Sequence, residues 1–228
     1  MMISPEGYYE FHIKGKTAAQ IMTVIRGLKK EIGHLKNTIE HPDYTPTICP
    51  DESVRLWCNR LYLERAKEAL VEAGGTYTPS QAELKVAAFD ESIPAITKLV
   101  FSIGGFFGGH EIRTITIDGN SVNMTIGKHF LPDEDIEVPE EIWSMTKDEF
   151  VEELHDLHIG EWRRHYSTKR FGYFVCDGTQ WELTIEFSNG HKPFTVSGDN
   201  AYPYNFDRFQ GFLGIETYIE DDDEEDEE

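Results

Sequence analysis

Basic residues are scarce in this chain of 228 residues. Only 21 lysines and arginines stand against 42 acidic residues, which gives a net charge of −21. Binding to nucleic-acid phosphates requires clustered lysine and arginine, and so does binding to an anionic membrane surface. The charge balance therefore argues against nucleic acid and against a membrane as direct partners.

Cysteines and long apolar runs are scarce as well. The three cysteines, Cys49, Cys58 and Cys176, are odd in number and form no C-x-x-C pair, which excludes a disulfide framework and a thiolate zinc site. The most apolar stretch, residues 93–109, contains a lysine, a proline and four glycines, so it does not predict a membrane span. Residues 1–9 lack the pattern of a signal peptide, and we expect a cytoplasmic protein with reduced thiols.

The negative charge is concentrated in the second part of the sequence. Residues 1–80 are neutral overall, with ten basic and ten acidic side chains. Nine consecutive acids form the segment Glu220–Glu228, which we predict to be a disordered tail because like charges repel and bury nothing. A second block, Asp133–Asp156, holds eleven acids and one base, but apolar residues interrupt it. This block predicts a folded surface with fixed negative charge.

Residues 1–75 are predicted to form a helical hairpin domain with one short strand. The strand is expected at Tyr8–Ile13, and Thr17 and Asp51 are expected to cap two long helices that end near His41 and at Gly74. The first helix carries a heptad seam, which either packs on the second helix or forms a homodimer. The seam consists of Ile21, Ile25, Leu28, Ile32, Leu35 and Ile39.

Residues 76–219 are predicted to form an antiparallel sheet with helices on one face, which makes the whole chain an α+β protein. Hairpin turns are expected at Asp118-Gly119-Asn120 and at Asn189-Gly190, and Thr146 with Glu149 forms a capping-box pattern. The expected strands are 96–103, 111–117, 121–126, 181–187 and 192–197, and the expected helices run from Thr146 to about residue 157 and over 206–213.

Paired glycines flank two phenylalanines at residues 104–109, between two expected strands. Glycine pairs let a backbone approach a ligand, but they also permit a bulged, twisted hairpin. A small-ligand module or enzyme would use this segment together with the loop Asp199–Pro203. Its ligand residues would be Gly105, Phe106, Phe107 and Gly108.

No metal or catalytic pattern is complete. Glu152, His155 and His158 lie at helical spacing, but the second copy that a di-iron site requires is missing. No G-x-S-x-G surrounds Ser197, and no cofactor-binding motif is present. We therefore expect a non-enzymatic protein without metal or cofactor. The main basic cluster consists of Arg163, Arg164, Lys169 and Arg170, and it either pairs internally or binds an acidic partner.

Three segments carry a resemblance: residues 101–111, 177–190 and 198–207. They resemble uncharacterised proteins of clostridial bacteria and their mobile elements over about residues 90–215, a likeness that implies no activity. In physical type the chain is similar to the acidic anti-defence inhibitors of phages, such as anti-CRISPR proteins.

The leading hypothesis is an acidic, protein-binding inhibitor that acts as a nucleic-acid mimic. Its partner would be a basic protein, such as a nuclease or a defence effector, because a row of carboxylates can replace phosphates on lysine and arginine. The alternatives are the small-ligand module and a plain structural dimer. The residues expected to bind the partner are Glu137, Glu140, Glu141, Asp148, Glu149, Glu152 and Glu153.

Overall fold

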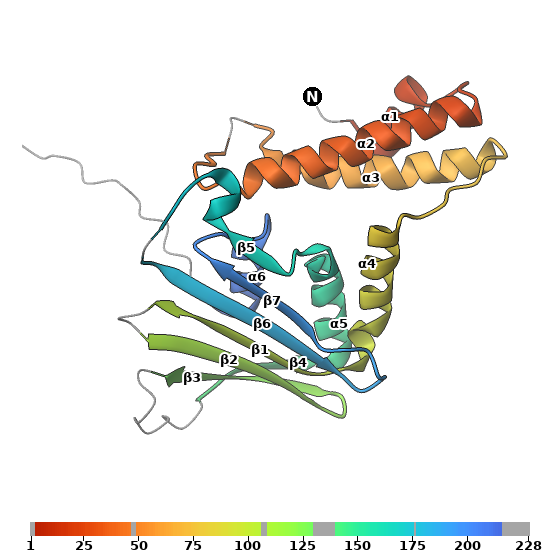
Figure 1. Cartoon of the computed structure of the whole chain (residues 1–228). Coiled ribbons are helices and arrows are strands. Elements are labelled where there is room, and N and C mark those ends of the chain that lie inside the picture. Colours follow the sequence, from red (N-terminus) through yellow and green to blue (C-terminus); the bar gives the residue numbers. More distant parts are fainter. Residues whose placement is uncertain (1–2, 47–48, 106–108, 130–139, 176, 216–228) are drawn as a thin grey trace, which may run out of the picture. The chain divides into compact units, whose positions relative to one another are not determined.

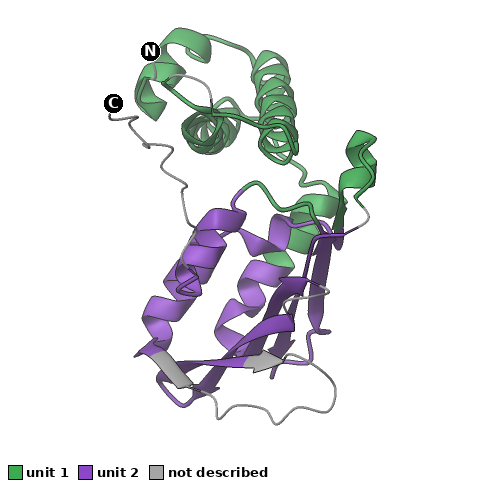
Figure 2. Ribbon diagram, turned by 90° about the vertical axis from the view of Figure 1, so that its left-hand side faces the viewer, with its two compact units in different colours: residues 1–88, 166–175, 200–204 green, residues 89–165, 176–199, 205–228 purple. Residues whose placement is uncertain are grey.

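The chain combines six α-helices and a seven-stranded sheet within the residues that the structure, a computed structural model, describes (Figure 1). These are residues 3–46, 49–105, 109–129, 140–175 and 177–215. Contacts divide the chain into two units (Figure 2). Unit 1 comprises residues 1–88, 166–175 and 200–204, and unit 2 comprises the rest. The boundary expected between the domains was residue 75. The first boundary between the units falls at residue 88, and residues 166–175 and 200–204 also belong to unit 1.

Unit 1 is built on the expected helical hairpin. Helix α2 (Ala18–Ile39) begins at a capping box formed by Thr17 and Gln20, and helix α3 (Glu52–Glu72) begins at Asp51, whose side chain accepts from the amide of Val54. Four seam residues, Ile21, Ile25, Leu28 and Leu35, are buried. The first three belong to a hydrophobic cluster shared with α3. The seam therefore packs helix on helix inside one chain, which leaves little of it for a homodimer.

The expected N-terminal strand is a helix, so that prediction is wrong. Helix α1 (Pro5–His12) begins where the Ser4 side chain accepts from the amide of Gly7, with a proline in its first turn. Tyr8 then stacks on Tyr62 of α3 at 4.2 Å between ring centroids, and Ile13 is buried in the α2–α3 cluster. Aromatic and β-branched residues in this segment favour a strand. The cap at Ser4 and the packing on α3 stabilise a helix instead.

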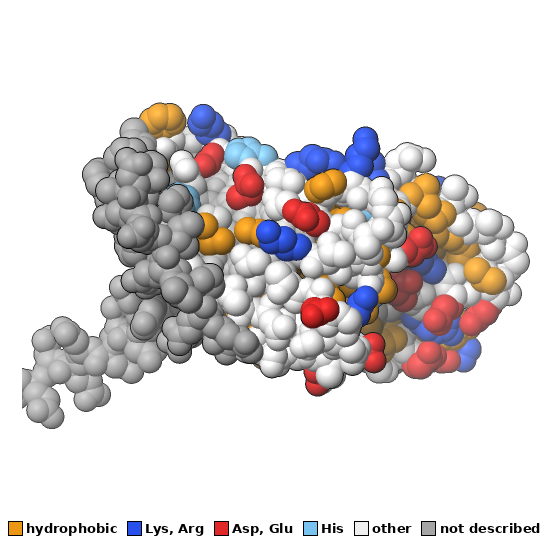
Figure 3. Space-filling view, turned by 90° about the horizontal axis from the view of Figure 1, so that it is seen from below, with side chains coloured by type: hydrophobic (Ala, Val, Ile, Leu, Met, Phe, Trp, Pro, Cys, Tyr) orange, Lys and Arg blue, Asp and Glu red, His pale blue; other side chains and the backbone are white. Residues whose placement is uncertain are grey.

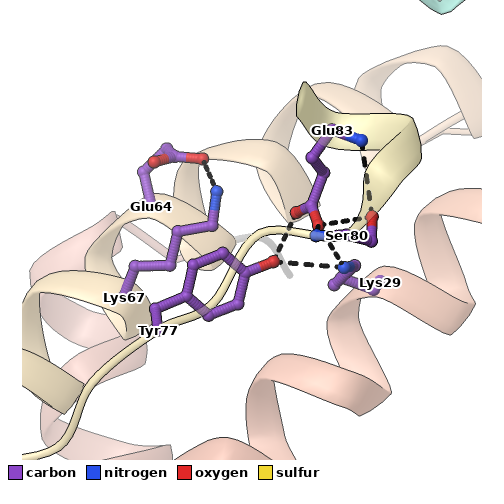
Figure 4. Close-up of polar contacts among 6 residues, drawn as sticks. All are labelled: Lys29, Glu64, Lys67, Tyr77, Ser80 and Glu83. Carbon is purple, nitrogen blue, oxygen red and sulfur yellow. Dashed lines mark hydrogen bonds and ion pairs between the residues drawn. The ribbon is translucent and has the colours of Figure 1, made fainter. Parts of the chain in front are cut away.

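A fourth helix, α4 (Gln81–Ser92), was not predicted, because residues 76–88 have little apolar periodicity. A polar network holds its first turn (Figure 4). Glu83 accepts from the amide and the hydroxyl of Ser80, from the Tyr77 hydroxyl and from Lys29 Nζ of α2. The network ties the segment after α3 to α2, and all of its members belong to unit 1.

Unit 2 contains all strands of the sheet except most of β5, and the strand order is β4-β3-β2-β1-β6-β7-β5. The pairs from β4 through to β7 are antiparallel, and the turns near residues 119 and 190 join β2 to β3 and β6 to β7 as expected. The strands are β1 (Ile96–Gly105), β2 (Gly109–Asp118), β3 (Ser121–His129), β4 (Glu140–Thr146), β5 (His165–Ser167), β6 (Thr179–Phe187) and β7 (Phe194–Asp199).

Two helices of unit 2 cover one face of the sheet, as predicted (Figures 1 and 2). Helix α6 (Phe206–Phe212) places Phe209 5.2 Å from the ring of Phe101 on β1. Helix α5 (Lys147–Asp156) buries Phe150 and Leu154, and the Phe150 ring lies 6.1 Å from that of Phe212. Because side chains alternate along a strand, the residues between the buried ones form a second, open face.

Candidate functional site

The first candidate site is the outer face of helix α5, which carries four of the seven residues expected to bind a partner. Asp148, Glu149, Glu152 and Glu153 all lie on α5 and are exposed. Glu140 and Glu141 belong to strand β4, next to β3. Glu137 lies outside the described residues, as do all of residues 130–139.

Helix α5 is amphipathic, and this property orients its acids. Phe150 and Leu154 are fully buried, and their spacing of four residues places them on one side of the helix. The acids occupy the positions between and beside them, so they project toward solvent. Glu149 differs from the others because it belongs to the capping box. Its carboxylate accepts from the amide of Thr146 at 2.8 Å, and hydrogen bonds from the amide and hydroxyl of Thr146 lower its pKa.

The remaining acids of α5 have few partners. Asp156 lies 3.4 Å from the guanidinium of Arg208. Within the part of the chain that the structure describes, the carboxylates of Asp148, Glu152 and Glu153 have no hydrogen-bond or ion-pair partner. The helix thus presents charge that is not neutralised by those residues.

The two units differ in net charge. The residues of unit 2 include 31 acids and 8 bases, a net charge of −23, whereas those of unit 1 include 11 acids and 13 bases, a net charge of +2. Fourteen of the 31 acids lie in residues 130–139 and 216–228, so the described residues of unit 2 hold 17 acids and 8 bases, a net charge of −9. Net negative charge attracts cationic ligands and speeds their encounter. The sequence analysis found the acid-rich segments, and the structure adds that the charge follows the division into units.

The second candidate site is a hollow of about 350 Å³ on the open face of the sheet. It lies at the end of strands β1, β6 and β7 where β1 approaches β2. The register places Ser102, Glu182 and Ser197 side by side on β1, β6 and β7. A second row holds His110, Gly104, Gln180 and Asp199.

Hydrogen bonds order both ends of this hollow. His110 Nδ1 lies 3.3 Å from the hydroxyl of Ser102. On the far side, His165 of β5 places Nδ1 3.1 Å from the hydroxyl of Ser197 and Nε2 3.7 Å from the carboxylate of Asp199. Two serine–histidine pairs therefore flank the central Glu182.

Gly104 pairs in the register with His110 and Gln180, two residues that line the hollow. It has no side chain, and an added Cβ would lie 2.0 Å from the carbonyl oxygen of Gly109 and 2.7 Å from the Cα of His110. Such contacts are too short for real atoms, so the close approach of β1 and β2 requires glycine here.

The structure describes only some of the ligand residues expected from the glycine-rich segment. Gly105 pairs with Gly109 at the end of the β1–β2 hairpin. Phe106, Phe107 and Gly108 lie outside the described residues. Asp199, from the expected loop, does line the hollow. Sequence reasoning missed Glu182 and both serine–histidine pairs. The sequence does show polar residues at alternate positions of these strands. It does not show the strand order that brings those residues together.

The predicted basic cluster is divided between the units. Arg170, which follows strand β5 in unit 1, lies 2.8 Å from the carboxylate of Glu40, whose side chain is only 4% exposed. Its guanidinium also donates to the side chain of Asn37. Arg163 and Arg164 belong to unit 2. Internal pairing, one of the two alternatives, therefore accounts for Arg170.

The described residues contain no group of three or more histidine, cysteine or acidic side chains placed to hold a metal ion. None of the described helices has the length and apolar character needed to cross a membrane. No protein-family model, no curated protein and no solved structure matches this chain. Function must therefore be argued from the two sites themselves.

Proposed function

We propose that this chain is a binding protein that docks onto a basic protein through the acidic face of helix α5, and that it inhibits a nuclease or defence effector by mimicking nucleic acid. The observation that carries the proposal is the row of exposed carboxylates on α5, of which Asp148, Glu152 and Glu153 have no partner among the described residues.

The density of charge supports mimicry. Five carboxylates, from Asp148 to Asp156, lie along α5. At a rise of about 1.5 Å per residue they span about 12 Å, a mean spacing of about 3 Å along the helix axis. Double-stranded DNA carries one charge per about 1.7 Å, and each of its strands one per about 3.4 Å. A lysine- and arginine-lined channel would therefore meet a similar line of negative charge.

The test exchanges the three unpartnered acids for lysine together: Asp148→Lys, Glu152→Lys and Glu153→Lys. Glu149 is left unchanged, because its reversal would remove the capping box and unfold the first turn of the helix. The matched control reverses Asp177, Glu182 and Glu186, which are also exposed acids of unit 2 but lie on or just before strand β6 and not on α5. Both triple variants change the net charge equally.

Tagged parent, test and control chains are used to capture proteins from bacterial lysate at low and high salt, and captured basic proteins are then measured singly by titration. We expect the parent and the control to capture a nucleic-acid-binding protein at low salt and to release it at high salt. The parent should also block the binding of nucleic acid to that protein. The α5 variant should lose at least tenfold in affinity. Equal binding by the two triple variants, or no basic protein captured by the parent, would refute the proposal.

A further inference from the structure

The hollow on the open face of the sheet is a site that the proposed function does not use. Its polar side chains come from β1, β2, β6 and β7, with His165 of β5 at its rim. All of these residues belong to unit 2, and none lies on helix α5. The chemistry of the lining residues identifies the class of ligand that fits.

The lining is polar and negatively charged. Glu182 and Asp199 contribute two carboxylates, and no lysine or arginine is among the residues that surround the hollow. Trp181 turns its indole to the helix-covered face, where it is 2% exposed, so the hollow lacks that aromatic wall. Most pockets for drug-like ligands are lined by apolar and aromatic groups. This one instead favours a small, polar ligand with positive charge.

The two carboxylates belong to diagonal neighbours on adjacent strands of the open face. Glu182 lies opposite Ser197 in the register, and Asp199 follows two residues later on the same face of β7. Such diagonal neighbours stand about 7 Å apart at the backbone. A four-carbon diamine, with bonds near 1.5 Å, extends to about 6 Å between its nitrogens.

The remaining groups offer further hydrogen-bond acceptors, and one of them positions the carboxylate of Asp199. The side chains of Glu182 and Gln180 have no partner among the described residues, so both are available to a ligand. Ser102 and Ser197 stand on either side of Glu182. His165 lies against both Ser197 and Asp199, which positions the second carboxylate at the rim. An ammonium group has three N–H donors, and hydroxyl and carboxylate oxygens can accept them.

Other charged residues near the open face do not form a comparable site. On the side of the molecule seen from below, acidic side chains lie next to basic ones in several places (Figure 3). Farther along β6, Glu186 lies directly opposite Lys98 of β1 in the register. Glu186 therefore has a cation as its neighbour, whereas Glu182 has serines.

The geometry points to a binding site for a short aliphatic diamine in this hollow, with Glu182 and Asp199 each receiving one ammonium group. The site would take free diamines of the putrescine type, with 1,4-diaminobutane as the probe. The carbon chain would lie over Gln180, which pairs with Asp199 in the register and lines the hollow beside Glu182.

Calorimetric titration of the full chain with 1,4-diaminobutane tests this inference. It is run at 0.15 M salt, where a Debye length of about 8 Å screens diffuse attraction to the acidic surface. The variants are Glu182→Gln and Asp199→Asn, and Glu186→Gln is the matched control, since it removes one carboxylate from the same face of the same strand. Melting temperatures verify that each variant is folded. The neutral probe 1,4-butanediol has the same length without charge.

We expect saturable 1:1 binding of the diamine, weakened at least tenfold by Glu182→Gln and by Asp199→Asn, and changed less than twofold by Glu186→Gln. The triple α5 variant should bind the diamine as the parent does, so this result is independent of the proposed function. The inference is overturned by an absence of saturable binding, by equal weakening in all three single variants, or by equal affinity for the diol. Binding of neutral sugars in place of the diamine would overturn it in favour of a carbohydrate site.

Discussion

Replacing Glu83 by glutamine should destabilise unit 1 in a pH-dependent way. Its carboxylate receives hydrogen bonds from Lys29 Nζ at 2.8 Å, from the Ser80 amide at 2.8 Å, from the Ser80 hydroxyl at 2.7 Å and from the Tyr77 hydroxyl. Partial burial alone would raise the pKa of Glu83. The hydrogen bonds outweigh burial and lower the pKa from 4.5 to about 2.

The magnitude follows from that difference in pKa. A drop from 4.5 to about 2 corresponds to about 3 kcal/mol of preference for the ionised carboxylate in the folded state. The side chains of Glu83 and Lys29 remain 28% and 35% exposed, so solvent screens part of this energy. We therefore expect Glu83→Gln to lower the free energy of unfolding by about 1.5 kcal/mol at pH 7.

The sign of the pH dependence is set by the lowered pKa. The stabilising contribution is fully present above the unfolded pKa of about 4.5 and is lost as the pH falls toward 2. The difference between parent and Glu83→Gln should therefore narrow progressively over that range. An isolated neutral amide at position 83 has no such titration.

Urea unfolding followed by circular dichroism at pH 7, 5, 4 and 3 measures this difference. Hydrogen exchange of peptides covering residues 76–92 reports whether the first turn of α4 opens. Glu91→Gln, at an exposed carboxylate of the same helix, is the control and should change little. Equal stability of parent and Glu83→Gln at pH 7, or a gap that stays constant down to pH 3, would refute the reasoning.

Two further substitutions test the ion pair of Arg170 with Glu40 and the close approach of β1 and β2 at Gly104. Arg170→Ala should cost about 2 kcal/mol in urea unfolding, because it leaves the buried carboxylate of Glu40 without this guanidinium; an unchanged midpoint would contradict that role. Gly104→Ala should cost about 1–3 kcal/mol, since its Cβ would meet the Gly109 carbonyl oxygen at 2.0 Å. Gly127→Ala, where a Cβ meets nothing within 4 Å, is its control in thermal unfolding, and similar melting temperatures for these two variants would argue against the close approach.

Local signals in the sequence predicted most of the elements. Thr17, Asp51 and Thr146 cap helices as expected, and both hairpin turns lie where their Asn and Gly residues indicated. These features depend on neighbours within a few residues, so a linear reading captures them. Helix α4 was within reach as well, because Ser80 and Glu83 form an S-x-x-E pattern that went unused.

The candidate sites differ in how far a sequence can reveal them. The acids of α5 are contiguous, and apolar residues at spacing four already indicated which side they face. The hollow is different, because Ser102 and Glu182 become neighbours only through the pairing of β1 with β6, eighty residues apart. That pairing passes over seven intervening elements and leaves no local pattern. The strand expected at Tyr8–Ile13 failed for a related reason, since packing on α3 overrides strand propensity.

The path of the chain between the units has a consequence for any attempt to separate them. The polypeptide crosses from one unit to the other five times, after residues 88, 165, 175, 199 and 204. A single proteolytic cut at one crossing leaves four covalent connections intact. A fragment ending at residue 88 would retain α1, α2, α3 and the first eight residues of α4, with the buried carboxylate of Glu40. It would lack Arg170, which a peptide covering residues 166–175 would have to supply in trans.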